Sequence, residues 1–238
     1  MPSPHLFRRA VKRVLEFGGL SVHRLPPVDP KKSLLVDGGA LVVIDVGANE
    51  GQYGRSIRRA GFPGTILSFE PQSAAFAKLE RRTSRDHHWT AHRCALGATN
   101  GEITLNIAGN SESSSVLPML DAHSANSPTS AYVATEQVPM RRLDDVVSQA
   151  GVNGPMHLKL DVQGFELAVL DGAPRAFEAA VSLEVEMSFV PLYSGQATFD
   201  GLFDRVRAAG FEFYDVVPGF RAKNGRLLQI DGLFLRSA

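Results

Sequence analysis

The chain has 238 residues, 44% of them hydrophobic, with 22 Gly and 14 Pro. This length suffices to bury the core of one catalytic-sized domain together with a modest extension. Basic and acidic residues balance at 25 each, so the overall charge gives no reason to expect a nucleic-acid partner. Cys94 is the single cysteine, which excludes an internal disulfide and a multi-cysteine metal cluster and favours a reducing, cytoplasmic compartment.

The first 32 residues carry an excess of Lys and Arg over Asp and Glu. Apolar residues recur among them at helical spacing, namely Leu6, Phe7, Val11, Val14 and Leu15. Such a basic amphipathic helix either packs its apolar stripe on the domain or lies peripherally on an anionic membrane surface. A Pro-rich stretch then separates this extension, residues 1–39, from a domain over residues 40–238. No stretch reaches the roughly 18 consecutive apolar residues of a membrane span.

Strand and helix patterns alternate through the first half of the domain. Strands are expected at residues 41–46, 64–70, 88–94 and 102–108, and helices at residues 52–60 and 71–82. This alternation predicts a parallel sheet with helical crossovers. Residues 109–130 are rich in Ser, Asn and Pro and have no periodicity, so they are expected to form a long loop of the kind that serves as a lid or binding loop.

The second half of the domain continues the pattern and then changes it. Strands are expected at residues 156–161, 181–187, 211–217 and 232–236, and helices at residues 165–171, capped by Gly172, and 199–209. The last two strands are joined through a turn at residues 223–225 with no helix between them. A connection of this kind predicts an antiparallel pair at the edge of the sheet.

The turn from Gly47 to Gly51, between the first strand and its helix, is the most informative functional feature. Such a turn presents backbone N–H groups to nucleotide-like ligands. Glu70 follows Asp45 by 25 residues and ends the second strand, where an acid accepts hydrogen bonds from ribose hydroxyls. Asn49 stands where a dinucleotide fingerprint has its second glycine, which favours S-adenosylmethionine, a ligand without phosphate, over NAD.

Six motifs occur in order between residues 40 and 236. They are VIDVGANEGQYG, ILSFEPQSAAFAKL, CALG, NSESSSVL, MRRLDDVV and HLKLDVQGFELAVLDGA. Together they resemble the FkbM family of S-adenosylmethionine-dependent methyltransferases. The resemblance implies a class I methyltransferase fold: an α/β, Rossmann-like sheet of seven strands with an antiparallel last strand, to which the N-terminal helical extension is added. It also implies S-adenosyl-L-methionine as cofactor.

The resemblance further implies which residues surround the cofactor. The segment from Asp45 to Asn49 matches positions around the methionine end, Glu70 matches the position of the ribose diol, and residues 95–96 match the adenine border. A serine loop at residues 113–115 matches a position near both cofactor and acceptor. The implied cofactor-binding residues are Asp45, Gly47, Asn49, Gly51, Glu70, Ala95, Leu96 and Ser114.

Three residues at the end of the fourth strand are candidates for catalysis. A sulfonium methyl group is already electrophilic, so the protein must align an acceptor and, for a hydroxyl, remove its proton. Asp161 is the candidate base, and strand periodicity places His157 and Lys159 on the same face. Alternatively, Asp161 caps the following helix. With Glu186, which shares a face of the next strand with Glu184, Asp161 is also the candidate ligand pair for an optional Mg²⁺ ion.

The leading functional hypothesis is transfer of a methyl group to a hydroxyl of a sugar, glycolipid or related natural product, because the FkbM family is frequently associated with glycan and polyketide tailoring. His123, in the long loop, is the histidine best placed to reach an acceptor. Two alternatives stay open: N-methylation of a small molecule, and a module that binds S-adenosylmethionine without catalysis. An NAD dehydrogenase is the least favoured. The sequence does not indicate an oligomeric state.

Overall fold

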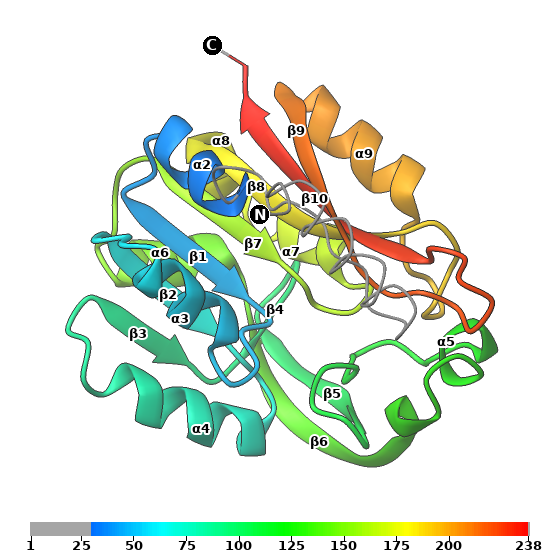
Figure 1. The fold of residues 1–238 in the computed structure, drawn as a ribbon. Coiled ribbons are helices and arrows are strands. Elements are labelled where there is room, and N and C mark those ends of the chain that lie inside the picture. The colour runs from blue at the N-terminus through cyan, green and yellow to red at the C-terminus, as the bar shows by residue number, and fades with distance from the viewer. Residues whose placement is uncertain (1–29, 238) are drawn as a thin grey trace, which may run out of the picture. The chain divides into compact units, whose positions relative to one another are not determined.

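A seven-stranded sheet forms the centre of the structure, a computed structural model that describes residues 30–237 (Figure 1). From Lys31 onward these residues form one compact unit. In spatial order the strands are β3 (Trp89–His92), β2 (Thr65–Phe69), β1 (Val42–Val46), β7 (Met156–Leu160), β8 (Ala180–Ser188), β10 (Gln229–Arg236) and β9 (Phe211–Pro218). The first five of these strands run parallel to one another, and β10 is antiparallel to both of its neighbours. The expected fold class, with its antiparallel last strand, is confirmed.

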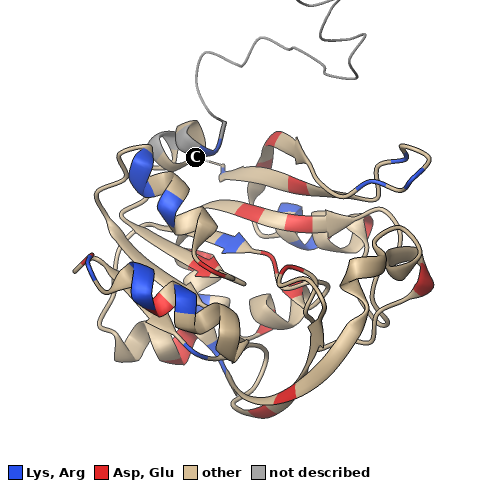
Figure 2. Cartoon of the chain, turned by 60° about the horizontal axis from the view of Figure 1, so that its bottom comes forward, with Lys and Arg blue, Asp and Glu red and all other residues tan. Residues whose placement is uncertain are grey.

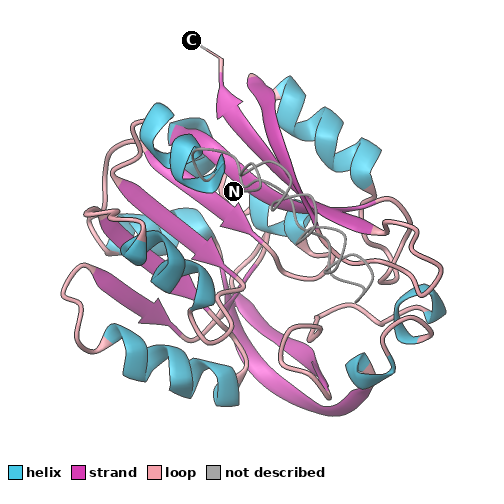
Figure 3. Ribbon diagram, in the orientation of Figure 1, coloured by secondary structure: helices cyan, strands magenta, loops and turns pink. Residues whose placement is uncertain are grey.

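Helices cover both faces of this sheet (Figure 3). Successive side chains of β1 point to opposite faces, so Val43 packs with helices α2 to α4 and Ile44 packs with helices α6 to α9. The helices are α2 (Pro30–Asp37), α3 (Gln52–Arg59), α4 (Ser73–Thr83), α6 (Leu143–Gln149), α7 (Glu166–Asp171), α8 (Pro174–Ala179) and α9 (Phe199–Ala208). The helices predicted from the sequence are confirmed as α3, α4, α7 and α9.

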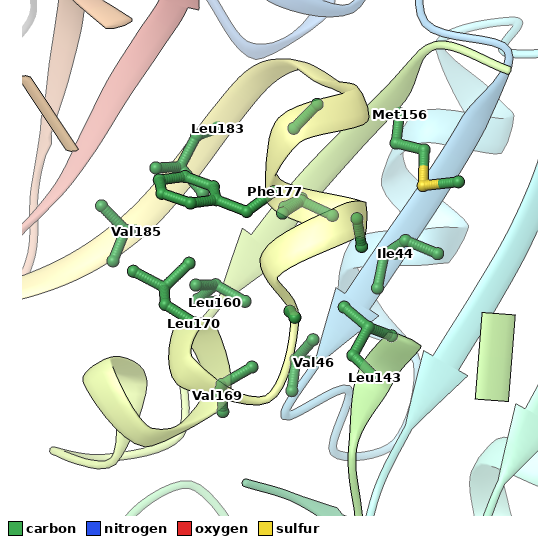
Figure 4. Close-up of a cluster of buried hydrophobic side chains, with 14 of the residues drawn as sticks. Ile44, Val46, Leu143, Met156, Leu160, Val169, Leu170, Phe177, Leu183 and Val185 are labelled. Atoms are coloured by element: carbon green, nitrogen blue, oxygen red, sulfur yellow. The ribbon is translucent and has the colours of Figure 1, made fainter. Parts of the chain in front are cut away.

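Aliphatic and aromatic side chains fill the space between the sheet and helices α6 to α8 (Figure 4). Ile44 and Leu160 reach this layer from β1 and β7, and Leu143, Leu170 and Phe177 reach it from the helices. All five are buried, and burial of such a side chain contributes about 1.5–3 kcal/mol. This layer holds β1 and β7 side by side, so the polar residues that follow the two strands emerge at the same edge of the sheet.

A second, three-stranded sheet has the order β4 (Ala95–Leu96), β6 (Tyr132–Arg141) and β5 (Gly101–Ala108). Strand β5 was expected from its alternation, whereas β6 was missed. Half of the side chains of β6 are exposed, including Val133, which is 69% exposed, so the apolar residues do not mark a buried face. Pairing with β5 over almost the whole length of β6 compensates for this weak pattern.

The long segment between β5 and β6 is mostly irregular, as expected, but it contains two short helices. These are α5 (Asp121–Ser124) and the 3₁₀ helix η1 (Pro128–Ser130). Each is at most one turn long, which is too short to produce a helical period in the sequence. Helices α6 and α8 were also missed, since α8 is separated from α7 by only Gly172 and Ala173.

The segment preceding β1 was expected to belong to the extension. Helix α2 occupies most of residues 30–39, and its Leu34 and Leu35 are buried. The predicted basic amphipathic helix lies outside the described residues. Within residues 30–237, no helix combines the length and the hydropathy needed to cross a lipid bilayer.

Candidate active site

A cavity of about 720 Å³ opens where the parallel strands β1, β2, β7 and β8 end. Its lining includes the turn after β1, Glu70 after β2, Asp161 after β7 and the serine loop. Acidic segments on neighbouring strands of the sheet are visible in Figure 2, and Glu184, Glu186 and Asp231 are the cavity-lining acids of β8 and β10. A cavity of this size at the carboxyl ends of parallel strands is the usual place for a ligand in an open α/β sheet.

The turn after β1 depends on residues with a positive φ angle. Gly47 has φ 75°, and Asn49, a residue type that tolerates this region, has φ 48°. The N–H groups of Gly47 and Ala48 both donate to the carbonyl of Phe69 at 3.0 Å, which ties the turn to β2. A Cβ atom on Gly47 would lie 1.7 Å from the carbonyl oxygen of Asp161, so only glycine permits this close approach to β7.

Glu70 lies in the cavity wall with its carboxylate fixed by two backbone groups. The N–H groups of Asn49 and Gln72 each donate to one of its oxygens at 2.8 Å. Burial raises the pKa of Glu70 to about 7, although these two N–H donors oppose the rise. Each oxygen keeps a lone pair for a further donor, which is what a ribose diol requires.

Replacing Glu70 by Ala is expected to weaken binding of S-adenosylhomocysteine by about 5- to 150-fold, or about 1–3 kcal/mol, the usual effect of losing a buried hydrogen-bond partner. Isothermal titration calorimetry measures this change. Glu80→Ala, which removes an exposed acid from α4, is the matched control and should leave the affinity unchanged. An affinity of Glu70→Ala equal to that of the control would remove Glu70 from the ribose.

The same carboxyl predicts a pH dependence of cofactor binding. Because the pKa of Glu70 is about 7, the ligand-free protein carries this group largely protonated at pH 6 and largely ionised at pH 8. Ribose hydroxyls donate to the ionised form, so affinity should rise with pH through about 7 and then level off. Calorimetry at several pH values tests this, with Glu70→Ala expected to show a flatter profile. An affinity that falls as the pH rises would contradict the assignment.

Lys159 lies between two carboxylates at the floor of the cavity. Its Nζ is 3.2 Å from Oδ2 of Asp161 and 3.7 Å from Oδ1 of Asp45. Asp45 is fully buried, and its Oδ2 accepts a hydrogen bond from Ser68 at 2.9 Å. Burial alone would lower the pKa of Lys159, but the charges of Asp161 and Asp45 raise it above its ordinary value. Lys159 is therefore a fixed cation at neutral pH, suited to holding Asp161 rather than to moving protons.

His157 shares a strand face with Lys159 and Asp161, as expected, but it lies deeper in the fold. It is fully buried and does not line the cavity. Its ring nitrogens are each 2.8 Å from a hydroxyl, of Tyr53 and of Ser182. Burial, together with the charge of Lys31, lowers the pKa of His157 to about 3, so the ring is neutral. The structure thus gives His157 two partners in the core and no access to a substrate.

Gln163 connects the two carboxylates that were proposed to bind Mg²⁺. Its Nε2 donates to Oδ1 of Asp161 and to Oε2 of Glu186, both at 2.9 Å. Its Oε1 accepts a hydrogen bond from the Tyr193 hydroxyl at 2.7 Å. Gln163 has φ 56°, an uncommon conformation for a non-glycine residue, which often occurs at functional sites.

This bridge does not fit the expected magnesium site at Asp161 and Glu186. An amide donor occupies the position between the carboxylates, where a cation would need acceptors only. In residues 30–237 no three His, Cys, Asp or Glu side chains come together so as to hold a metal ion. Burial, and then the charges of Asp161 and Glu166, raise the pKa of Glu186 well above its ordinary value. The prediction of a Mg²⁺ site is not supported.

Most of the residues expected around the cofactor line the cavity, namely Gly47, Asn49, Glu70, Ala95, Leu96 and Ser114. Asp45 and Gly51 do not: Asp45 lies beneath the floor, and Gly51 precedes α3 with a positive φ. In the serine loop, Ser114 Oγ accepts a hydrogen bond from the backbone of Ala108, and Ser115 Oγ donates to the carbonyl of Gln163. The loop is thereby fixed to the strand ends.

Several cavity residues were not singled out from the sequence. Lys31, on α2, forms ion pairs with Glu184 and, at 3.3 Å, with Asp231. Further examples are Tyr53, Phe220 and Gln229. Lys31 precedes the six motifs, and Phe220 and Gln229 follow them, in regions without a recognisable signal. Tyr53 lies within the GQYG motif. His123, which was expected to reach an acceptor, does line the cavity.

The fold and this site define a class I S-adenosylmethionine-dependent methyltransferase. Three features define this class here: the order of the seven strands, the glycine turn after β1 and the acid after β2. The chain belongs to the FkbM methyltransferase family, whose domain model matches residues 45–213.

Individual relatives are distant. The 2-O-methyltransferase NoeI of Sinorhizobium fredii is 24% identical over 169 residues, which cover 68% of this chain and 70% of NoeI. Methyltransferase 1 of Beauveria bassiana is 27% identical over 143 residues, 55% of this chain and 57% of that protein. The crystal structure of an FkbM methyltransferase from Methylobacillus flagellatus superposes with a TM-score of 0.53 at 16% identity, covering 87% of this chain and 48% of the other. That likeness concerns the fold, and the chain spans about half the length of two of these three proteins.

The residues of the cavity fit S-adenosylmethionine. Oδ1 of Asn49, a buried oxygen, has no hydrogen-bond partner within the described part of the chain and can accept from an ammonium group. Gly47 lets the turn lie directly against the end of β7, and Glu70 offers a carboxylate to a diol. Bound here, the cofactor supplies an electrophilic methyl group.

Proposed function

We propose that this protein transfers a methyl group from S-adenosylmethionine to a hydroxyl of a sugar, glycolipid or related natural product. The main supporting observation is the position of Asp161. The backbone carbonyl of Asp161 lies against Gly47 in the glycine turn. The side chain of Asp161 accepts a hydrogen bond from Gln163, which lines the cavity together with Glu186. A carboxylate at this junction can reach an acceptor hydroxyl that approaches the cofactor from the far side. The name of NoeI, a 2-O-methyltransferase, is consistent with an oxygen acceptor.

In this proposal Asp161 removes the proton of the hydroxyl. As the acceptor oxygen forms its bond to the methyl carbon, the carbon–sulfur bond breaks, its electron pair stays on sulfur, and the hydroxyl proton passes to the carboxylate. Lys159 and Gln163 fix the two oxygens of Asp161 at 3.2 and 2.9 Å, so the carboxylate has a defined orientation before the acceptor binds.

The charges around the cavity favour a neutral acceptor over an amine. Glu184 and Asp231 are both ion-paired with Lys31, and Asp161 is ion-paired with Lys159. A cationic amine would find these three carboxylates already paired with a lysine. A hydroxyl compound needs only hydrogen bonds, which such compensated groups can still accept.

We extend the proposal to the class of acceptor and to contact with a membrane. The acceptor is a small molecule, glycan or glycolipid rather than a nucleic acid. For a glycolipid, the basic N-terminal segment would contact the anionic membrane surface that holds the acceptor, with the enzyme on the cytoplasmic side. Vesicle sedimentation with and without residues 1–29 tests this contact, since deletion should abolish binding to anionic vesicles.

A methyl-transfer assay tests the main proposal. The protein is incubated with S-adenosylmethionine that carries a deuterated methyl group and with methyl glycosides of common hexoses, 6-deoxyhexoses and amino sugars, and products are identified by mass spectrometry. We expect transfer to a hydroxyl oxygen of at least one glycoside. Transfer to the nitrogen of an amino sugar alone would replace the proposal by N-methylation. Binding of the cofactor without any transfer would favour a non-catalytic module.

A further inference from the structure

We propose that the end of the cavity bounded by His123, Phe220 and Gln229 is the subsite that binds one sugar ring of the acceptor. The inference rests on the proposed function for its link to catalysis. His123 comes from α5 in the long segment, Phe220 from the connection between β9 and β10, and Gln229 from the start of β10. None of them belongs to the motifs around the cofactor, and all three line the same cavity as Glu70.

The first observation is a set of buried polar atoms that have no partner within residues 30–237. Among them, Nδ1 of His123 and Nε2 of Gln229 belong to this end of the cavity, and Oε2 of Glu184 lines the same cavity further along β8, where Glu184 pairs with Leu233. The three side chains are 5%, 5% and 2% exposed, and each lines the cavity. Buried polar groups without partners are unfavourable, so a site that contains several of them is complete only when a ligand supplies the missing hydrogen bonds.

The chemistry of these atoms indicates a polyhydroxyl ligand. The amide nitrogen of Gln229 requires an acceptor, and the carboxylate oxygen of Glu184 requires a donor. Burial lowers the pKa of His123, so its ring is neutral at physiological pH and has one donor and one acceptor nitrogen. A hydroxyl both donates and accepts, so vicinal hydroxyls of a sugar can satisfy such a mixed set, whereas a phosphate or an ammonium group cannot.

The second observation is an aromatic surface beside these atoms. The rings of His123 and Phe220 are 5.1 Å apart, and Phe220 is partly exposed. The backbone N–H of Gln229 donates to the backbone carbonyl of Phe220 at 3.2 Å, which holds the two residues side by side. A flat apolar surface flanked by polar groups matches a sugar ring, which has an apolar C–H face and a polar edge.

The subsite connects directly to the proposed base. The ring of His123 packs edge-on against Tyr193 at 5.2 Å, and the Tyr193 hydroxyl donates to Gln163, which in turn donates to Asp161. A sugar bound against Phe220 therefore lies on a wall that ends at the carboxylate. The ring held against Phe220 fixes the orientation of the acceptor, and the hydroxyl that is methylated lies at the Asp161 end of this wall, which would make methylation specific for one position.

Binding of methyl glycosides to the complex with S-adenosylhomocysteine tests the subsite without requiring turnover. Saturation-transfer NMR identifies which glycosides of the panel bind, and calorimetry measures their affinity. We expect Gln229→Leu and Phe220→Ala each to reduce the affinity about tenfold and to leave the affinity for S-adenosylhomocysteine unchanged. Matched controls are Gln137→Leu and Phe189→Ala, which change exposed residues outside the cavity. Phe220→Leu keeps apolar volume should Phe220→Ala fail to fold.

Two results would overturn the subsite: no glycoside binds to the wild-type complex, or the cavity variants bind glycosides as well as the controls do. Failure of the proposed function has a different signature. A glycoside that binds at these residues but accepts no methyl group would leave the subsite standing and refute the transfer. Methyl transfer to a hydroxyl compound other than a saccharide, without binding of any glycoside, would support the transfer and refute the subsite.

Discussion

Replacement of Gly47 by Ala is expected to destabilise the protein by about 2–5 kcal/mol and to abolish measurable cofactor binding. The added Cβ would lie 1.7 Å from the carbonyl oxygen of Asp161, a backbone atom that cannot move without separating β1 from β7. The φ angle of 75° adds the cost of a left-handed conformation. Overpacking typically costs about 1–3 kcal/mol and the left-handed conformation about 1–2 kcal/mol, which together give the expected range.

Chemical denaturation measured with and without S-adenosylhomocysteine tests this prediction. Gly39→Ala is a matched control, because Gly39 also has a positive φ, 63°, but nothing lies within 4 Å of its added Cβ. The control should lose about 1–2 kcal/mol and still bind the cofactor. Equal stability of the two variants, or retained cofactor affinity in Gly47→Ala, would mean that the turn does not require its close approach to β7.

Replacement of Asp161 by Asn is expected to lower the rate of methyl transfer by about 10²- to 10⁴-fold, the usual contribution of a general base. The amide has nearly the shape of the carboxylate, so the affinity for S-adenosylhomocysteine should change little. Single-turnover kinetics with the glycoside identified in the transfer assay measures the chemical step apart from product release.

Asp171→Asn supplies the control for this substitution, since Asp171 is an exposed acid at the end of α7. It should leave the rate unchanged. If Asp161→Asn instead retains a near-normal rate, then Asp161 only orients its neighbours, and Glu186, which shares the Gln163 amide, becomes the next base to test.

The turn after β1 and the acid after β2 could be predicted to line the cavity because their signals are local. The turn from Gly47 needs positive φ angles, and Glu70 directly follows a short buried strand, so both features are encoded within a few residues of sequence. Strand periodicity also placed His157, Lys159 and Asp161 on one face. Periodicity does not give depth, however, so it could not show that His157 lies below the cavity with partners from α3 and β8.

The part of the cavity proposed to bind the acceptor depends on contacts between distant segments, and most of its residues were not predicted from the sequence. The two acids Asp161 and Glu186 indicated a metal site, but the side chain of Gln163 lies between them, and its orientation follows from an uncommon backbone angle. Phe220 and Gln229 meet only because a β-connection folds back on itself. Neither residue type has a sequence signal that would distinguish this role from an ordinary surface position.

Methyl transfer and the sugar subsite linked to it both require that the protein bind S-adenosylmethionine. Parallel calorimetric titrations with S-adenosylmethionine, S-adenosylhomocysteine and NAD test this binding most directly. We expect the first two to bind with one-to-one stoichiometry and NAD not to bind, because Asn49 stands where a pyrophosphate would require glycine. Binding of NAD alone, or of none of the three, would contradict this expectation.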